Sequence, residues 1–186
     1  MKYPHSIPLW RTNGELLRGD ALSRVVLSSA GARWNDAVVE QRHCSRFELA
    51  DVMHKQHVIG INIGPSTTWE FKKAGRFRRF FKARGGICFF PSHQPFSCRP
   101  NVEKGVIVNV LFLALDPVFV SRIAEGLEFD ADRIELIEQR RGTDSTLHHI
   151  AMALLAGVQT GVALDRMYGE ALSTALAVHL FSRAWR

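Results

Sequence analysis

Histidine is the residue type in this chain best suited to holding a metal ion. A metal site on a β-strand needs two His separated by one residue, so that both side chains point to the same face. His54 and His57 are three residues apart and would point to opposite faces of a regular strand. His148 and His149 are adjacent on a helical segment, and His93 has no acidic partner at a suitable spacing. We therefore expect no metal site and no cofactor.

The candidates for covalent or acid–base chemistry are equally sparse. The three cysteines, Cys44, Cys88 and Cys98, form no CxxC pair, which argues against a disulfide framework or a zinc site. No GxSxG motif occurs, and Asp130 and Asp132 lie in a turn-like stretch where solvated carboxylates are the simpler interpretation. The sequence names no catalytic residue, and we expect no enzymatic activity.

A run of basic and aromatic residues is the remaining chemical feature. Such a run can hold phosphates and stack bases, but a half-buried hairpin with Phe inward and Arg outward has the same composition. The solvated hairpin is the simpler interpretation, and contact with an anionic effector or with nucleic acid stays open. The residues are Lys72, Lys73, Arg76, Arg78, Arg79, Lys82 and Arg84, interleaved with Phe71, Phe77, Phe80 and Phe81.

Composition places these residues in an ordinary globular chain of 186 residues with a net charge of +6. The positive charge favours contact with a polyanion, although charge alone is weak evidence. No apolar run reaches the roughly 20 residues that span a bilayer, and residues 1–20 lack the apolar centre of a signal peptide. We expect a cytoplasmic protein without a membrane segment.

The elements that position the candidates are strands first and helices last. Short runs with strand character and turn signals fill the segment from Val25 to Leu113, with a hairpin over 67–82 and a long β-branched run over 105–115. Many short strands at spacings of roughly 8 to 12 residues are typical of a sandwich or a barrel. Residues 1–24 show no clean period and are expected to form an irregular N-terminal arm.

From residue 116 onward the pattern becomes helical. Asp116 and Pro117 are a helix start, which predicts a short helix over 116–125, and Ile134–Ile137 is a candidate short strand. Apolar residues at three- and four-residue steps predict a helix from about Thr143 or Asp144 to 161 and a second from about 165 to 183. The apolar face of this second helix is assigned to Met167, Ala171, Leu172, Ala175, Leu176, His179 and Leu180. The predicted fold class is α+β.

Several stretches together resemble the N-terminal region of AraC-type (AraC/XylS) transcription regulators. The tail over 166–180 looks very much like the segment just ahead of the DNA-binding domain in that family. One departure is Arg84-Gly85-Gly86, where the family usually carries Pro-Gly-Asp. The stretches are Trp34–Glu40, Lys55–Pro65, Trp69-Glu70, Gly75–Arg79, Gly86–Pro95 and Arg166–Leu180.

The resemblance implies a cupin-like β-barrel of the jelly-roll type over 25–140, followed by an antiparallel helix pair over 141–186 that forms a homodimer. It also implies an unknown small-molecule effector, and contact with DNA only through a C-terminal helix-turn-helix domain. We expect that domain to be absent from this chain, since no tandem helix-turn-helix can be fitted before residue 186.

The expected binding site is the barrel interior, because a small barrel can enclose one ligand. The candidates for ligand binding lie in or beside the predicted strands: His57, Asn62, Trp69, Phe89 and Asn109. The direction in which they point stays open, because a one-residue shift in register reverses the face. The candidates for the dimer interface are Leu147, Leu154, Leu176 and Leu180, which could instead cover only the chain's own barrel.

These features predict an effector-sensing and dimerisation domain of an AraC-type regulator. The effector would bind in or over the barrel mouth and bias how two protomers present their DNA-binding domains. Two alternatives stay open. One is a cupin-type metalloenzyme acting on a small molecule, and the other is a stand-alone interaction module that regulates by forming heterodimers.

Overall fold

A computed structural model of the chain describes residues 7–17, 23–32, 34, 36–127, 136–140, 142–160 and 166–182. Two antiparallel sheets lie face to face. The six-stranded sheet has the order β2-β1-β5-β10-β7-β8. Its strands are β1 (Leu9–Arg11), β2 (Leu16–Leu17), β5 (Leu49–Met53), β7 (Thr67–Lys73), β8 (Arg76–Lys82) and β10 (Phe96–Pro100).

The second sheet has five strands in the order β3-β4-β11-β6-β9. Its strands are β3 (Ser23–Ser28), β4 (Ala37–Cys44), β6 (His57–Asn62), β9 (Ile87–Phe90) and β11 (Val108–Leu115). The long β11 is the centre of this sheet and pairs along its length with both β4 and β6. The β-branched run over 105–115 therefore forms the expected core strand, although its first three residues lie outside the strand.

The strand pairing is nested, which is the arrangement of a jelly roll. Strand β4 pairs with β11, β5 with β10, β6 with β9, and β7 with β8, and successive pairs alternate between the two sheets. The predicted jelly-roll topology is confirmed. The predicted closed barrel is wrong, because the strands of the described residues form two separate hydrogen-bonded sheets.

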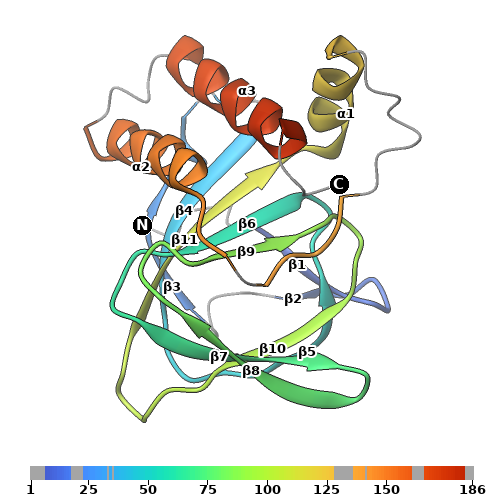
Figure 1. Ribbon diagram of the computed structural model, residues 1–186, viewed down its shortest axis with the longest axis vertical. Helices are drawn as coiled ribbons and strands as arrows, with labels where there is room; N and C mark the ends of the chain where they lie inside the picture. Colours follow the sequence, from blue (N-terminus) through green and yellow to red (C-terminus); the bar gives the residue numbers. More distant parts are fainter. Residues whose placement is uncertain are drawn as a thin grey trace.

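Three helices cover the outer face of the five-stranded sheet (Figure 1). They are α1 (Pro117–Gly126), α2 (Ser145–Thr160) and α3 (Arg166–Ser182). As predicted, Asp116 caps α1, and its carboxylate accepts the backbone N–H groups of Val118 and Phe119. The carboxylate of Asp144 accepts the N–H of Leu147 in the first turn of α2. The strands-then-helices order gives the expected α+β class.

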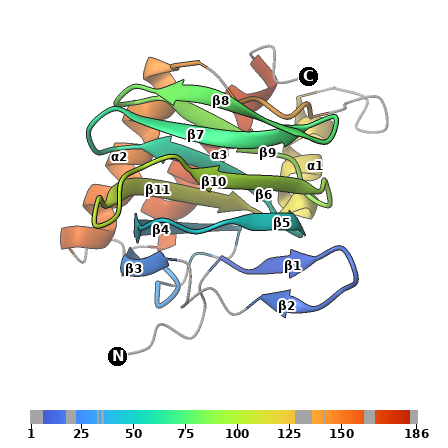
Figure 2. The same ribbon diagram turned by 90° about the horizontal axis from the view of Figure 1, so that it is seen from below.

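Two apolar cores result, one on each face of the five-stranded sheet. Odd-numbered residues of β11, such as Leu111 and Leu113, pack under the helices, while Val108 and Val110 face the other sheet. This is the period-2 alternation of a strand buried on both faces. The second view shows the sheets stacked, with β1 and β2 at one side of the molecule (Figure 2).

The predicted hairpin over 67–82 is confirmed as β7 and β8. Its turn has Ala74 at φ 50° and Gly75 at φ 79°, the two positive φ values of a two-residue hairpin turn that suits the strand twist. Strands β1 and β2 lie within residues 1–24, which were expected to be irregular, so that expectation is wrong for these residues. Strands β5 and β10 were not predicted either. Their pairing is interrupted by a register shift between Phe96 and Cys98, and Asp51 adopts a positive φ of 50°.

The four leucines predicted at a dimer interface lie in the core beneath the helices. Leu147, Leu154, Leu176 and Leu180 are each fully buried within the chain. Their side chains therefore cover the chain's own sheet. Met167, Ala171 and Ala175 were assigned to the apolar face of the last helix, and that assignment is wrong, because all three are exposed.

Part of the predicted short strand Ile134–Ile137 and the predicted helix start near 165 lie outside the described residues. Nearby, Gln139 forms an isolated bridge with Phe89. No helix in the described part of the chain combines the length and the apolar character needed to cross a bilayer.

Candidate functional site

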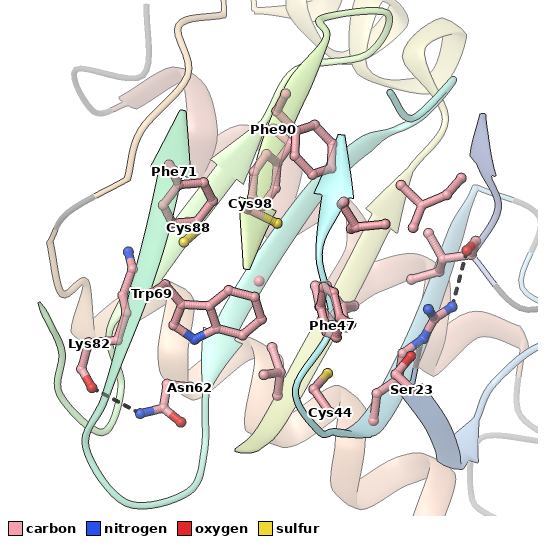
Figure 3. A pocket seen from close by; sticks show the side chains of 18 of the residues that line it. Ser23, Cys44, Phe47, Asn62, Trp69, Phe71, Lys82, Cys88, Phe90 and Cys98 are labelled. Atoms are coloured by element: carbon pink, nitrogen blue, oxygen red, sulfur yellow. Dashed lines mark hydrogen bonds between the residues drawn. The ribbon is translucent and has the colours of Figure 1, made fainter. Parts of the chain in front are cut away.

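An apolar cavity of about 80 Å³ lies between the two sheets (Figure 3). Its wall is formed by inward-facing residues of both sheets and by the first described residues of the chain, Ile7 and Leu9. The largest side chains of the wall are aromatic: Phe47, Trp69, Phe71, Phe90, Phe96 and Phe112. A cavity of this size is smaller than the roughly 150 Å³ cavity that accommodates benzene in an engineered protein core. A ligand larger than a few heavy atoms therefore requires side chains of the wall to move.

Strand β4 carries a buried ion pair into this interior. Glu40 and Arg42 lie two residues apart on the inner face, and Arg42 Nε donates to Glu40 Oε2 at 2.8 Å. The same two side chains hold Ile7, whose N–H donates to Glu40 Oε1 and whose carbonyl accepts from Arg42 Nη2, each at 3.1 Å. The pair thus anchors the N-terminal segment at the cavity wall. Within the pair the two charges offset each other.

Lys82 is the second cation of the wall, and its charge is not offset in this way. It is 3% exposed, and its ammonium donates to the carbonyls of Ile87, at 2.6 Å, and of Arg140. Among the described residues, none supplies a carboxylate that forms a salt bridge with Lys82. A buried charge without a counter-charge is costly, so an anion in the cavity would be stabilised there.

All three cysteines line the cavity, a convergence that their spacing in the sequence does not reveal. Burial raises the pKa of Cys44 to about 11 and also raises the pKa of Cys98. The pKa of Cys88 is raised by burial as well, an effect that nearby Lys82 partly opposes. The thiols are therefore protonated at neutral pH and act as small apolar groups, since the thiolate is the nucleophile and the metal ligand.

Two of the five predicted ligand-binding residues line the cavity. Trp69 contributes its ring to the wall and meets Phe47 edge-on, with ring centroids 5.9 Å apart. Asn62 closes one end beside Lys82 (Figure 3), where its amide donates to the carbonyls of Pro65, Lys82 and Ala83. The amide oxygen accepts the N–H of Gly64. Asn62 thus satisfies the backbone of two loops and is held rigidly at the wall.

The other three predicted residues do not line the cavity. Phe89 is fully buried in the core under the helices, and His57 stacks on it with ring centroids 6.1 Å apart. Burial lowers the pKa of His57 to about 4, and its Nδ1 accepts the N–H of Ser92. Asn109 points away from the cavity and accepts a hydrogen bond from the Gln41 side chain at 3.2 Å. The structure therefore brings together Asn62 and Trp69 alone from this set.

The charged residues at the wall, unlike Asn62, were not among the predicted ligand-binding residues. Lys82 belongs to the basic run and was expected on the solvated face of the hairpin; it is buried instead. Glu40 and Arg42 give one usable signal, since charged residues two apart within an apolar strand share a face. Whether that face is the inner one depends on the register of β4, which tertiary structure decides.

Phe47 lies between the cavity and the surface. It lines the cavity and also a surface hollow of about 610 Å³. The hollow is polar, and its further lining includes three arginines, two glutamates and an asparagine: Arg46, Arg79, Arg99, Glu48, Glu70 and Asn101. Phe47 is half-buried and lies in the wall that the cavity and the hollow share.

The donors around the cavity do not form a metal-ligand set. In the part of the chain that the structure describes, no group of three or more His, Cys, Asp or Glu side chains is placed to hold a metal ion. His54, the histidine at the cavity wall, has its Nδ1 3.1 Å from the carbonyl oxygen of Pro8. The residues of the wall therefore do not fit a resident metal.

No family model matches the chain, and no curated protein does. Among solved structures, hydroxypropylphosphonic acid epoxidase from S. wedmorenis is similar, with 8% identity and a TM-score of 0.34 over 43% of this chain and 44% of that one. An oxalate decarboxylase variant from Bacillus subtilis has 16% identity and a TM-score of 0.33 over 59% of this chain and 32% of that one. The aligned part spans less than half of each of these solved chains.

The two solved proteins are enzymes, an epoxidase and a decarboxylase. The prediction of no enzymatic activity is not borne out by these comparisons.

Proposed function

We propose that the cavity binds a small, mainly apolar molecule that carries one anionic group. The observation that carries this proposal is Lys82, a buried ammonium without a described carboxylate partner, in the wall of an otherwise apolar cavity. Small-molecule sites are mostly apolar, with a few polar groups that fix orientation. The aromatic rings would contact the body of the ligand, and Lys82 would contact its anionic end.

The proposed role of this binding is effector sensing, as the resemblance to AraC-type regulators implies. Strands β4, β6, β9 and β11 line the cavity with one face and support the helices with the other. A ligand that spreads the inner face would therefore move the strands beneath α2 and α3. A shift of this kind requires that the ligand bind one arrangement more tightly than the other.

The proposal is tested by thermal unfolding with pairs of small aromatic and aliphatic compounds, each acid matched to its neutral amide. We expect at least one acid to raise Tm and its amide to raise it less, because binding to the folded state stabilises it by mass action. Lys82→Met should abolish the preference for the acid, whereas the exposed Lys72→Met should retain it. Should Lys82→Met fail to fold, Lys82→Gln keeps a donor for the two carbonyls and serves the same purpose.

The result that would overturn the proposal is a broad library in which no compound at high concentration shifts Tm. A shift by acids and amides alike would keep the cavity as a site but overturn the role of Lys82. The alternative of a cupin-type metalloenzyme rests on fold class. Metal analysis of the purified protein tests it, and stoichiometric Fe, Mn or Zn would support it over effector sensing.

A further inference from the structure

The net charge of the chain is concentrated in one hairpin and the loop after it. Residues 67–84 hold seven of the 24 Lys and Arg residues and one of the 18 Asp and Glu residues. The segment therefore accounts for the whole net charge of +6, and the rest of the chain is balanced. Six of the seven cations are exposed, since Lys82 alone among them is buried.

The same hairpin presents aromatic rings on the outer face of the six-stranded sheet. The register of β7 and β8 places Phe80 opposite Trp69, which faces the cavity, so Phe77, Arg79 and Phe81 point outward. Phe81 is 68% exposed, which is unusual for a large apolar side chain in a strand. Phe77 and Phe81 are four residues apart along β8, a separation of about 14 Å at ~3.4 Å per residue.

Arginine and polar groups lie beside these rings on the neighbouring strands. The guanidinium of Arg99 from β10 stacks over Phe77 at 4.2 Å from the ring centroid. Glu70 on β7 is bound by Arg99 at 2.6 Å and by Arg79 at 3.1 Å, and these two arginines hold its pKa below the usual range. The hollow of about 610 Å³ adjoins this row and adds Arg46 and Asn101.

We propose that this outer face, formed by β8, β7 and β10, binds single-stranded nucleic acid. Exposed rings stack on bases, and exposed Lys and Arg neutralise phosphates, which together form the sequence-tolerant platform of single-strand binding proteins. Arg99 offers a guanidinium plane on which a base can stack as well. The site is separate from the cavity, because Phe77 and Phe81 lie on the opposite face of the sheet from Trp69 and Phe71.

The exposed aromatic residues favour single-stranded nucleic acid over other polyanions as the ligand of this face. Duplex DNA keeps its bases stacked on one another, so an exposed Phe on a sheet face gains little from it. An anionic membrane would favour an apolar hairpin tip, but the tip is Lys73-Ala74-Gly75-Arg76, and Phe81 lies at the far end of β8. An acidic peptide would use the cations without requiring the open ring of Phe81.

The experiment measures fluorescence anisotropy of labelled oligothymidine and oligouridine with the full chain at several salt concentrations. We expect saturable binding to both, with log K falling linearly against log salt by about 0.7 for each neutralised phosphate. Phe81→Ala should weaken binding by about 5- to 150-fold, the range of ~1–3 kcal/mol per stacked base, and leave the salt slope unchanged. Because Phe81 is exposed, this substitution leaves the core intact.

The charge contribution is tested separately with Lys72→Ala combined with Arg79→Ala, whose side chains lie on the same face as Phe77 and Phe81. This double variant should weaken binding and reduce the salt slope by roughly 0.7 for each phosphate that the removed cations neutralise in the wild type. The matched controls are Val118→Ala and Arg122→Ala on α1, whose side chains are exposed and lie on the helical side of the molecule. Both controls should bind as the wild type does.

Four results would overturn the proposal. They are absence of saturable binding to either oligonucleotide at low salt, equal affinity for a duplex of the same length, wild-type affinity of Phe81→Ala, and binding to anionic phosphatidylserine vesicles or polyglutamate in place of the oligonucleotides. Retained thermal stability of each variant shows that weaker binding does not come from unfolding.

Discussion

Ionisable side chains on the inner faces of the sheets differ in how their charge is balanced. Glu40 and Arg42 neutralise each other and anchor Ile7, whereas the partners of the Lys82 ammonium among the described residues are carbonyl oxygens and the Cys88 thiol. His54 is neutral at neutral pH, because burial lowers its pKa to about 4. Of these side chains, Lys82 is therefore the one that we expect to select for a polar group on a ligand in the cavity.

His54 predicts a loss of stability in mild acid. Its folded-state pKa lies below the ordinary histidine value of 6.5, so its contribution to stability is present above pH 6.5 and is lost as pH falls toward 4. Between about pH 6.5 and pH 5 the stability decreases by about 2 kcal/mol through this group. We expect urea unfolding at about pH 7.5 and pH 5 to show this fall, and His54→Gln to reduce it.

His54 stacks on Phe96, with ring centroids 5.5 Å apart. The nearby Arg42 guanidinium lowers the pKa of His54 further, whereas the hydrogen bond with the Pro8 carbonyl raises it. His57 also has a lowered pKa and remains as the acid-sensitive group in the variant. The exposed His149→Gln is the matched control and should leave the pH dependence unchanged. An unaltered fall in His54→Gln would contradict the role given to this residue.

At the scale of elements, two glycines allow α3 to pack closely against α2 and against the loop between β3 and β4. Gly157 of α2 leaves room for Tyr168 of α3, where a Cβ would come within 2.8 Å of the Tyr168 ring. The Tyr168 hydroxyl donates to the carbonyl of Ala153 in α2. Gly169 leaves room in the same way for the indole of Trp34, which lies in the loop between β3 and β4.

Gly169→Ala should therefore destabilise the protein although alanine is the better helix former. The clash with Trp34 would cost about 1–3 kcal/mol, more than the roughly 1 kcal/mol gained in helix propensity. Differential scanning calorimetry should show a fall in Tm of roughly 2–4 °C per kcal/mol of net destabilisation. Ala175→Ser, at an exposed position of the same helix, should change Tm little. A higher Tm in Gly169→Ala would show that Trp34 can move away.

The elements that could be predicted are those with a local signal. The Asp116-Pro117 start, the hairpin of β7 and β8 and the long β11 follow from capping, turn and β-branching rules. Strand β10 has no such signal, since it is five residues long and ends at Pro100. It exists because β5 and β7 pair with it on either side.

At the scale of the whole molecule, the five-stranded sheet contributes one face to the core under the helices and the other face to the core between the sheets. Because the four leucines of α2 and α3 are buried within the chain, a homodimer through the helices would have to use other residues. Met167 and Ala171 are exposed on α3, and we propose that they form part of that interface.

We expect the wild type to be a dimer in size-exclusion chromatography with light scattering, and Met167→Glu with Ala171→Glu to be a monomer. In the proposed symmetric dimer, the glutamates introduced in one protomer would lie close to those of the other across the two-fold axis. Their negative charges would repel each other. Val118→Glu, on the equally exposed start of α1, is the control and should leave the mass unchanged. A wild type that is monomeric at high concentration would contradict the proposed dimer.

The sequence by itself determined the class of element at most positions and the strands-then-helices order. Those features depend on local backbone preferences and on the period of apolar residues, both of which can be read along the chain. The tertiary structure alone decided that two sheets do not close into one barrel, that Lys82 faces inward and that Asn109, His57 and Phe89 do not. The physical reason is that side-chain direction in a strand reverses with a one-residue change in register, and register is fixed by contacts between strands far apart in the sequence.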